Sequence, residues 1–496
     1  MAHLWEEILG VARRQPAAPA LLCGGSTWSY GQLVSEAARV ARRLERAGVR
    51  PGDRVLSTLP NGPDLVFLLL GTLACGGVYA PLHAAATERE ILEAQRELEP
   101  KVSVVPRSPT LGTPETFASL SRAPAEPETS REGGGDDAAL VLRTSGTSGQ
   151  PKGVVLSHRA LLSNLRSVLA SWEWSPRDRL LLVLPCSHLH GLGLGLLGTF
   201  LAGGSVVLAP RFEPGEVLPS LEKYECTLFF GVPPLYERLL RLPERPRERR
   251  IARALRLWVS GSAPLSPATF RRFSERFGVE LLDRYGMSET GFVLSAPLAG
   301  PRRPGVVGLP LPGTEVVVAD EAEADRGKVR EVAVGEVGEL LVRGPGLFSG
   351  YWGDPEGTRR SFVGGFFRTG DLAFREPDGM VGIVGRRSLD IIKTRAYRVS
   401  ALEVENALRE HPAVVEAAAL GLPHPQWGEE VVAVVVPLGR DVTEEELRAH
   451  AARILAPYKV PRRVVFLPEL PKTGPGKVEK KRLRDLLASL GEGRSA

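Results

Sequence analysis

Short apolar runs alternate with amphipathic segments over most of the 496 residues. One unit pairs the strand-like run 55–59 with a helical segment near 64–73. Two others pair 179–184 with a helical segment at 191–202, and 255–260 with 268–277. This alternation predicts βαβ units and therefore an α/β fold built on largely parallel sheets. A chain of this length also exceeds one ordinary core, so we expect more than one domain.

The pattern changes in the last third of the chain. From about residue 314, short strand-like runs separated by Gly and Pro turns predict a β subdomain at about 314–385. A smaller unit of helices and strands follows Gly385. We therefore predict a large N-terminal domain at 1–385, with parallel-rich sheets, helices and this β subdomain. A small mobile C-terminal α+β domain is expected at 386–496, with a hinge near 386–388.

Composition and charge exclude several classes of protein. The 63 Lys+Arg and 58 Asp+Glu residues are interspersed and leave a net charge of +5, so we expect no nucleic-acid partner. The arginine-rich run 245–250 is interpreted as solvated surface. The four cysteines lack metal-ligand spacing and are expected to be reduced and mostly buried. The most apolar stretch, 65–82, contains Gly and Pro and barely reaches a membrane-spanning length.

The first residues show no basic segment followed by an apolar core, so they do not form a secretory signal. We therefore expect a cytoplasmic protein with no membrane insertion. The sequence leaves open whether the chain is a monomer or a homodimer.

The most distinctive local feature is the segment 144–154, Thr-Ser-Gly-Thr-Ser-Gly-Gln-Pro-Lys-Gly-Val, which follows the apolar run 138–142. Small hydroxyl residues and glycines allow backbone N–H and hydroxyl groups to converge on an anion. Lys152 can supply a positive charge to a polyphosphate. The spacing differs from that of a Walker loop. The predicted phosphate-binding residues are Thr144, Ser145, Gly146, Thr147, Ser148, Gly149 and Lys152.

Six further segments follow this loop in order. They are Gly261-Ser-Ala-Pro-Leu265, Arg284-Tyr-Gly-Met-Ser-Glu-Thr290, Gly344 through Trp352, Arg368-Thr-Gly-Asp371, Gly385-Arg386 and Pro471-Lys-Thr-Gly-Pro-Gly-Lys477. Together they resemble the signatures of the adenylate-forming superfamily, which holds acyl-CoA synthetases, luciferases and peptide-synthetase adenylation domains. The resemblance spans roughly residues 28–477. It implies an ATP-dependent acid:CoA ligase that makes an acyl-adenylate with release of pyrophosphate and then passes the acyl group to a thiol.

The resemblance also implies roles for single residues, with ATP, Mg²⁺ and CoA as the cofactors. Asp371 would accept the ribose hydroxyls with support from Arg386, and Glu289 would help to hold Mg²⁺, the ion that links a carboxylate to a triphosphate. The remaining nucleotide contacts would come from Gly261, Ser262, Ala263, Asp283, Tyr285, Gly286, Met287, Ser288 and Lys477. The implied catalytic residues are Lys477, Thr144, Lys152, His188 and Glu289. CoA would bind at Lys393, Thr394, Arg395 and Ala396, although the subfamily usually carries two glycines at the last two positions.

The acid pocket is predicted to involve His188, His190, Arg284 and Met287. A pocket for an alkyl or aryl acid would be lined by apolar residues, whereas an arginine can grip a second carboxylate with two parallel hydrogen bonds. The segments around His188 and Arg284 resemble malonyl-CoA synthetases of this superfamily, in which the arginine before Tyr-Gly-Met binds the distal carboxylate. The resemblance therefore implies malonate or a methylmalonate-like dicarboxylate as the substrate.

Several alternatives remain open from the sequence. Arg284 could instead pair with Asp283, Glu289 or a phosphate, and His188 could be a tunnel gate or a packed neutral histidine. The enzyme could activate a fatty or aromatic acid, or load the thiol of a carrier protein instead of CoA. A nucleotide-binding regulatory protein without catalysis is the alternative outside the enzymes.

Overall fold

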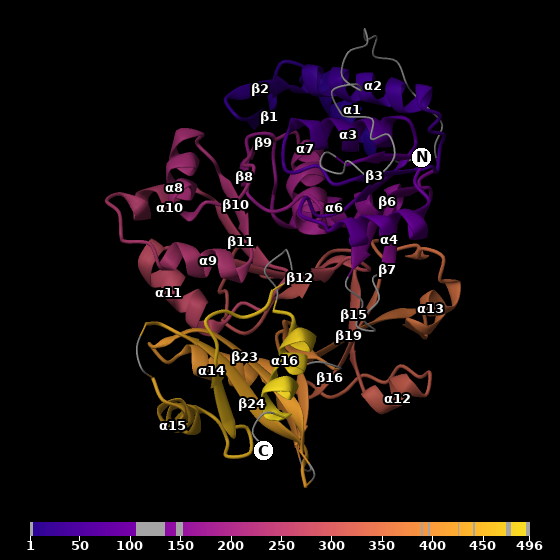
Figure 1. The fold of residues 1–496 in the computed structure, drawn as a ribbon. Helices are drawn as coiled ribbons and strands as arrows, with labels where there is room; N and C mark the ends of the chain where they lie inside the picture. Colours follow the sequence, from indigo (N-terminus) through magenta and orange to yellow (C-terminus); the bar gives the residue numbers. More distant parts are fainter. Residues whose placement is uncertain are drawn as a thin grey trace.

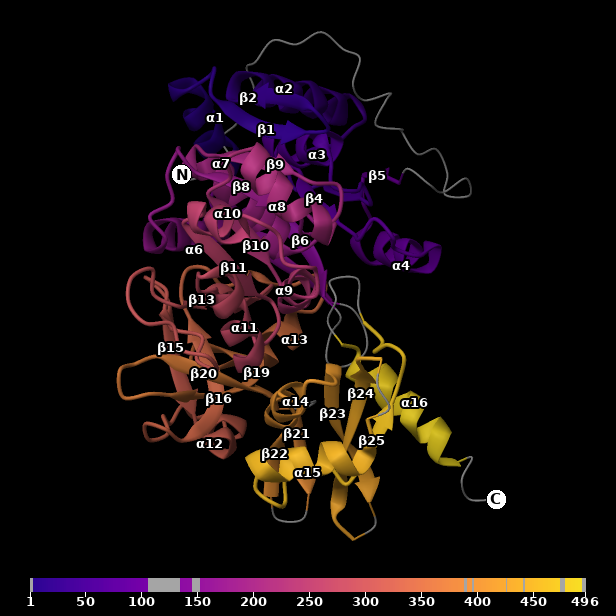
Figure 2. The ribbon, with the colours of Figure 1, turned by 90° about the vertical axis from the view of Figure 1, so that its left-hand side faces the viewer.

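The structure is a computed structural model that describes residues 3–105, 134–144, 152–387, 390–394, 397–424, 426–439, 442–472 and 478–492. The N-terminal helices and the elements from β21 onward lie at opposite ends of the molecule (Figure 1; Figure 2). The predicted fold class is confirmed: large parallel-rich sheets are followed by a small C-terminal unit of helices and strands.

Among the described residues, the largest sheet has nine strands in the order β14-β13-β12-β11-β10-β8-β9-β1-β2. Its central strands run parallel from β1 to β12, as the alternating pattern predicted. The strands are β1 (Pro19–Cys23), β2 (Ser26–Ser29), β8 (Arg179–Leu182), β9 (Ser205–Leu208), β10 (Leu228–Gly231), β11 (Leu257–Gly261), β12 (Leu282–Met287), β13 (Gly291–Ser295) and β14 (Leu309–Pro310). One face is covered by α8 (Pro214–Lys223), α9 (Pro233–Leu240), α10 (Glu248–Ala254) and α11 (Pro267–Phe277), through an aromatic-rich core.

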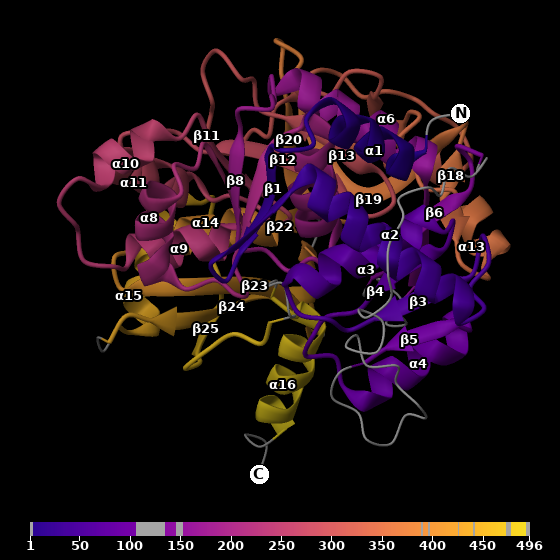
Figure 3. The same ribbon diagram turned by 90° about the horizontal axis from the view of Figure 1, so that it is seen from above.

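A second sheet has the order β17-β7-β6-β4-β3-β5. Its strands are β3 (Arg54–Ser57), β4 (Val78–Pro81), β5 (Val102–Val104), β6 (Ala138–Thr144), β7 (Lys152–Ser157) and β17 (Gly350–Tyr351). Helices α1 (Leu4–Arg14), α2 (Tyr30–Arg46) and α3 (Pro63–Ala74) pack against one another beside it (Figure 3). The remaining helices of this region are α4 (Glu88–Leu98) and α6 (His158–Ser171).

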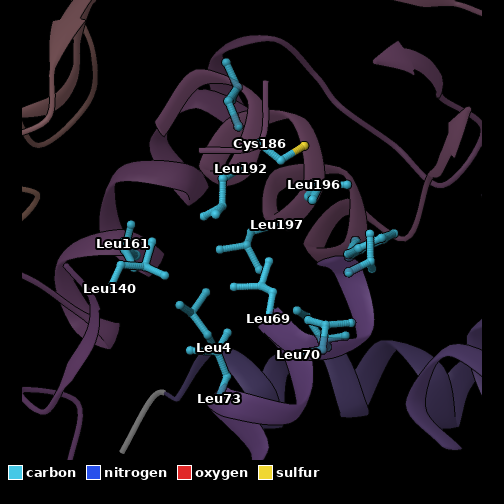
Figure 4. Packing of buried hydrophobic residues seen from close by; sticks show 14 of the residues in the cluster. Leu4, Leu69, Leu70, Leu73, Leu140, Leu161, Cys186, Leu192, Leu196 and Leu197 are labelled. Carbon is cyan, nitrogen blue, oxygen red and sulfur yellow. The ribbon is translucent and has the colours of Figure 1, made fainter. Parts of the chain in front are cut away.

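The core between the two sheets is built largely from leucine. Leucines of α1, α3, β6 and α6 converge on those of a π-helix, η1 (His190–Gly198), whose residues are all buried (Figure 4). The sequence predicted one helix over 191–202, but the structure has η1 followed by α7 (Thr199–Ala202). Close packing accounts for Gly191 of η1, because a Cβ there would lie 2.4 Å from the carbonyl oxygen of Pro185.

The strands of the β subdomain pair antiparallel. It contains β15 (Glu315–Ala319), β16 (Val337–Arg343), β18 (Phe362–Val363), β19 (Phe366–Arg375) and β20 (Val381–Arg386), with α12 (Glu321–Asp325) and α13 (Pro355–Arg360) beside them.

The C-terminal elements have cores of their own. They are β21 (Ile391–Thr394), β22 (Tyr397–Ser400), α14 (Ala401–Arg409), β23 (Val414–His424), β24 (Gly428–Pro437), α15 (Glu444–Ile454), β25 (Arg463–Phe466) and α16 (Lys480–Glu492). The domain boundary and the hinge near 386–388 stay predictions, and Ser388 lies outside the described residues.

Three expectations about surface and burial can be compared with the structure. The cysteines are free, and Cys75, Cys186 and Cys226 are buried while Cys23 is partly buried. The arginines of the run 245–250 are exposed. None of the helices that the structure describes combines the length and the apolar character needed to cross a membrane.

Candidate active site

The two ends of the predicted phosphate loop meet in a β-hairpin. Thr144 ends β6 and Lys152 begins β7, and the two residues pair across the antiparallel strands. The Nζ of Lys152 lies 4.3 Å from the centre of the Tyr351 ring and 3.8 Å from the carboxylate of Asp354. The five loop residues between them that were predicted to bind phosphate lie outside the described residues: Ser145, Gly146, Thr147, Ser148 and Gly149.

A second group of predicted residues meets around Asp371, which is 5% exposed. Its Oδ2 accepts a 2.5 Å hydrogen bond from the hydroxyl of Tyr285, and its Oδ1 lies 2.8 Å from Nε of Arg386. Asp371 and Arg386 are partners in the register of β19 and β20. Three residues that the resemblance implies for nucleotide binding, Tyr285, Asp371 and Arg386, are therefore in direct contact. They come from β12 and the β subdomain, which lie far apart in the sequence.

The other predicted nucleotide residues lie where the parallel strands β11 and β12 end. The backbone of Ser262 is in the left-handed region, with φ of +67°. Asp283 accepts a hydrogen bond from the backbone N–H of Arg284, and burial raises the pKa of the Asp283 carboxyl to about 8. Gly286 has no space for a side chain, because its Cβ would lie 2.1 Å from the carbonyl oxygen of Gly291. Ala263, Met287 and Ser288 are partly buried in the same region.

Glu289 occupies the turn between β12 and β13 and is 7% exposed. Its Oε1 accepts a 3.2 Å hydrogen bond from the hydroxyl of Tyr351. Burial raises the pKa of the Glu289 carboxyl. The described residues contain no cluster of three or more metal-ligating side chains. A Mg²⁺ ion at Glu289 would therefore take most of its ligands from phosphate oxygens and water, which is how this ion usually binds beside a nucleotide.

Two of the four predicted acid-binding residues, Arg284 and His190, meet at Ser262. Its Oγ accepts a 3.1 Å hydrogen bond from Nη2 of Arg284 and lies 3.3 Å from Nδ1 of His190. The guanidinium of Arg284 also lies over the ring of Phe292, at 4.8 Å. A Cβ on Gly261 would approach Nε of Arg284 to 2.5 Å, so glycine at this position makes room for the guanidinium.

The polar atoms of this pocket are incompletely paired. Arg284 is 4% exposed, yet no carboxylate of the described residues lies within 4.0 Å of its guanidinium, and its Nε has no hydrogen-bond partner there. Other buried atoms of the described residues also have no hydrogen-bond partner, and those on the segments next to His190 and Ser262 are Ser187 Oγ, His188 Nε2, His190 Nε2 and Ser260 Oγ. Buried polar atoms are almost always paired in proteins, so this group points to a polar ligand.

Burial also sets the charges in this pocket. It lowers the pKa of His188 to about 4 and that of His190 well below its ordinary value, where the nearby charge of Arg284 acts in the same direction. Burial lowers the pKa of Arg284 to about 10. At neutral pH the pocket therefore holds two neutral histidines and one cation. An ion pair of Arg284 with Asp283 or Glu289 is absent from the described residues.

The predicted C-terminal site residues are described only in part. Lys477, Arg395 and Ala396 lie outside the described residues, and so does the side chain of Lys393. Thr394 ends β21 and is buried. In the strand register it pairs with Tyr397 of β22 and with Gly428 of β24.

Two residues near the site were missed by the sequence analysis. Tyr351 was identified only as part of a Gly-Tyr segment, but it contacts both Lys152 and Glu289. Lys480 is held between Asp390 and Glu405, at 2.6 Å and 2.7 Å. Nothing in the basic run that begins at Lys480 distinguishes this lysine from its neighbours, so only the structure could identify it.

Comparison with known proteins agrees with this geometry. The chain matches the family model of the AMP-binding enzyme over residues 10–352 and that of the AMP-binding enzyme C-terminal domain over residues 403–477. It is 36% identical to the mitochondrial malonate–CoA ligase ACSF3 of Homo sapiens, over 92% of this chain and 87% of that protein. It is 35% identical to a feruloyl-CoA synthase of Amycolatopsis sp, over 95% and 96%.

Among solved structures, ATP-bound MatB from Rhodopseudomonas palustris superimposes with a TM-score of 0.91 at 34% identity, covering 99% of this chain and 100% of that chain. The order of the two matched family models, the fold and the full-length similarity all indicate the same family. The chain therefore belongs to the AMP-binding, adenylate-forming enzyme superfamily and is an acid:CoA ligase of the AMP-forming class.

Proposed function

We propose that this ligase activates malonate, or a methylmalonate-like dicarboxylate, with Mg-ATP and transfers the acyl group to CoA. The observation that carries the proposal is the buried guanidinium of Arg284, which has no carboxylate partner among the described residues. A dicarboxylate supplies that partner, because one carboxylate reacts while the other remains charged. The similarity to malonate–CoA ligase and to MatB supports the same substrate.

Charge pairing explains how such a pocket selects its acid. Breaking a buried ion pair by removing one partner costs several kcal/mol, roughly 3–5, because a charge remains buried without compensation. A fatty or aromatic acid has no second carboxylate, so it would leave the buried charge of Arg284 without compensation. The hydrogen bond to Ser262 and the contact with Phe292 orient the guanidinium but do not neutralise it.

In the first step, the substrate carboxylate attacks the α-phosphate of ATP and pyrophosphate leaves. The protein contributes positioning and charge neutralisation. Lys152 and the loop after Thr144 bind the phosphates, and Asp371 accepts the ribose hydroxyls while Arg386 and Tyr285 hold its carboxylate. Glu289 is the protein ligand for Mg²⁺, which neutralises phosphate charge when bound. Lys477 acts on the α-phosphate and the reacting carboxylate.

In the second step, the thiolate of CoA attacks the acyl-adenylate and AMP leaves. The residues proposed to contact CoA are Lys393, Thr394, Arg395 and Ala396, and His188 borders the acid. A cytoplasmic location and the choice between monomer and homodimer stay predictions. Nucleic acid is not expected as a partner.

Pyrophosphate release tests this proposal. The enzyme is assayed with Mg-ATP and each of malonate, methylmalonate, acetate, benzoate and octanoate, with and without CoA. Malonate should have the highest kcat/KM, and CoA should accelerate formation of AMP. A preference for benzoate or octanoate would retain the ligase chemistry but reject the dicarboxylate substrate. If a carrier-protein thiol accelerates formation of AMP and CoA does not, the acyl acceptor is the carrier protein and not CoA.

A further inference from the structure

Tyr351 joins two parts of the site that are far apart in the sequence. Its short strand, β17, pairs with β7, the strand that begins at Lys152, so that Tyr351 faces Val154 in the register. Backbone hydrogen bonds on either side fix this pairing: the N–H of Ser349 donates to the carbonyl of Val155, and that of Trp352 to the carbonyl of Gly153. The Tyr351 backbone is therefore held firmly against the phosphate-loop hairpin.

The side chain of Tyr351 contacts two charged groups at once. Its ring centre lies 4.3 Å from Nζ of Lys152, and its hydroxyl donates a 3.2 Å hydrogen bond to Oε1 of Glu289. Phe348 packs edge-on against the ring at 4.9 Å, and its backbone N–H donates to the carbonyl of Glu289. One partly buried side chain thus lies between the cation proposed for the triphosphate and the carboxylate proposed for the metal.

Each contact has a physical consequence. An ammonium over an aromatic face is attracted by the ring quadrupole, which limits where a flexible lysine can go. A hydroxyl that donates to a carboxylate stabilises the charged form and restricts its rotation.

We propose that Tyr351 is a positioning residue for adenylation, with its ring orienting Lys152 and its hydroxyl orienting Glu289. This inference rests on the roles proposed above for Lys152 and Glu289. It does not depend on which acid is the substrate. The competing explanation is that Tyr351 only packs against Phe348.

Equilibrium binding of ATP measured by calorimetry, without any acid, tests the inference. The Mg²⁺ concentration for half-maximal ATP binding is compared in wild type, Tyr351→Phe, Tyr351→Leu and Glu289→Gln. Tyr351→Phe keeps the ring and loses the hydroxyl. It should raise that Mg²⁺ concentration by about 10-fold, as expected for a lost hydrogen bond to a charged group, and leave the Kd for ATP at saturating Mg²⁺ within about 2-fold.

Tyr351→Leu removes the ring as well. It should show the same shift in Mg²⁺ dependence and a further rise of about 3-fold in the Kd for ATP at saturating Mg²⁺, because Lys152 loses its aromatic contact. Tyr30→Phe is the matched control. The Tyr30 hydroxyl is buried and bonded to the carbonyls of Phe200 and Gly204, so its loss should lower the Tm and leave both binding constants unchanged.

The outcomes distinguish the positioning role of Tyr351 from the metal-binding role of Glu289 on which it rests. Shifts in Mg²⁺ dependence in both Glu289→Gln and Tyr351→Phe support the inference. A shift in Glu289→Gln alone overturns it and assigns Tyr351 to packing, while the metal role of Glu289 survives. If Glu289→Gln leaves the Mg²⁺ dependence unchanged, the metal role itself is wrong and the inference fails with it.

Discussion

The hydroxyl of Tyr285 donates a 2.5 Å hydrogen bond to Oδ2 of Asp371, while Nε of Arg386 lies 2.8 Å from the other carboxylate oxygen. Each oxygen of this buried acid therefore has a protein partner. These contacts fix the orientation of the carboxylate that is proposed to accept the ribose hydroxyls.

Asp371→Asn removes the charge while preserving the shape of the side chain. We expect the Kd for ATP to rise by about 10-fold, the loss typical of a hydrogen bond to a charged group. With 2′,3′-dideoxy-ATP the substitution should have a smaller effect, because the hydroxyls that Asp371 is proposed to accept are already missing. An equal loss with both nucleotides, measured by calorimetry, would show that Asp371 does not contact the ribose.

Gly261→Ala tests the packing behind Arg284. The new Cβ would lie 2.5 Å from Nε and 2.7 Å from Cζ of Arg284, so the guanidinium must move. We expect the KM for malonate to rise by about 10-fold or more, since small displacements of a positioning group are costly. Gly10→Ala in α1 is the control and should leave the KM unchanged, because its nearest neighbour is the end of the Arg14 side chain at 3.5 Å. An unchanged KM in Gly261→Ala would contradict the position of the guanidinium.

The buried His158 should make the stability of the protein depend on pH. Its ring packs against that of His3, with the ring centres 3.6 Å apart and the planes tilted by 30°. Burial, assisted by the charge of His3, lowers the pKa of His158 to about 3. An unfolded histidine titrates near pH 6.5. Between these values the unfolded chain binds the extra proton, so this contribution to stability is full above pH 6.5 and falls as the pH falls toward 3.

His158→Gln should therefore flatten the decrease in the free energy of unfolding between pH 6.5 and 5, relative to wild type. The comparison of the two slopes reports on His158 together with His3, whose titration is coupled to it, because the other titrating groups are common to both proteins. Chemical denaturation at several pH values measures the slopes, and parallel curves would show that His158 takes no part.

The partly buried lysine Lys480 should contribute to the stability of the C-terminal unit. Lys480→Ala leaves the carboxylates of Asp390 and Glu405 without their shared cation. Losing one partner costs about 3–5 kcal/mol in a fully buried ion pair and about 0–1 kcal/mol in an exposed one. Because the Lys480 and Asp390 side chains are 14% and 21% exposed, we expect Lys480→Ala to destabilise the protein by about 1–3 kcal/mol. The neighbouring Lys481 is exposed, and Lys481→Ala should change the free energy of unfolding by less than about 0.5 kcal/mol. Similar stabilities of the two variants would contradict a structural role for Lys480.

The sequence was most informative where local pattern decides structure. The alternation of apolar and amphipathic runs predicted the parallel sheets, because each strand and helix carries its own periodicity. The motif order predicted that Asp371, Tyr285 and Arg386 belong together, and they are in contact. The π-helix was predicted as part of an ordinary helix, since the close packing that requires Gly191 depends on Pro185 in three dimensions.

Contacts between distant segments could not be predicted in this way. The position of Tyr351 depends on β17, a two-residue strand that pairs with β7, and β7 comes from a much earlier part of the sequence. The missing carboxylate partner of Arg284 likewise becomes visible only when all neighbours are placed. The motifs indicated which residues matter, and the structure shows what each described residue contacts.

The most direct test of the account is the kcat/KM of Arg284→Met with malonate and with octanoate. Arg302→Met, which removes an arginine bonded mainly to backbone carbonyls outside the pocket, is the control. We predict that Arg284→Met loses at least about 100-fold with malonate and retains or gains activity with octanoate, while Arg302→Met keeps the wild-type ratio. An equal loss with both acids, or a wild-type enzyme that prefers octanoate, would contradict the assignment of Arg284 to the second carboxylate.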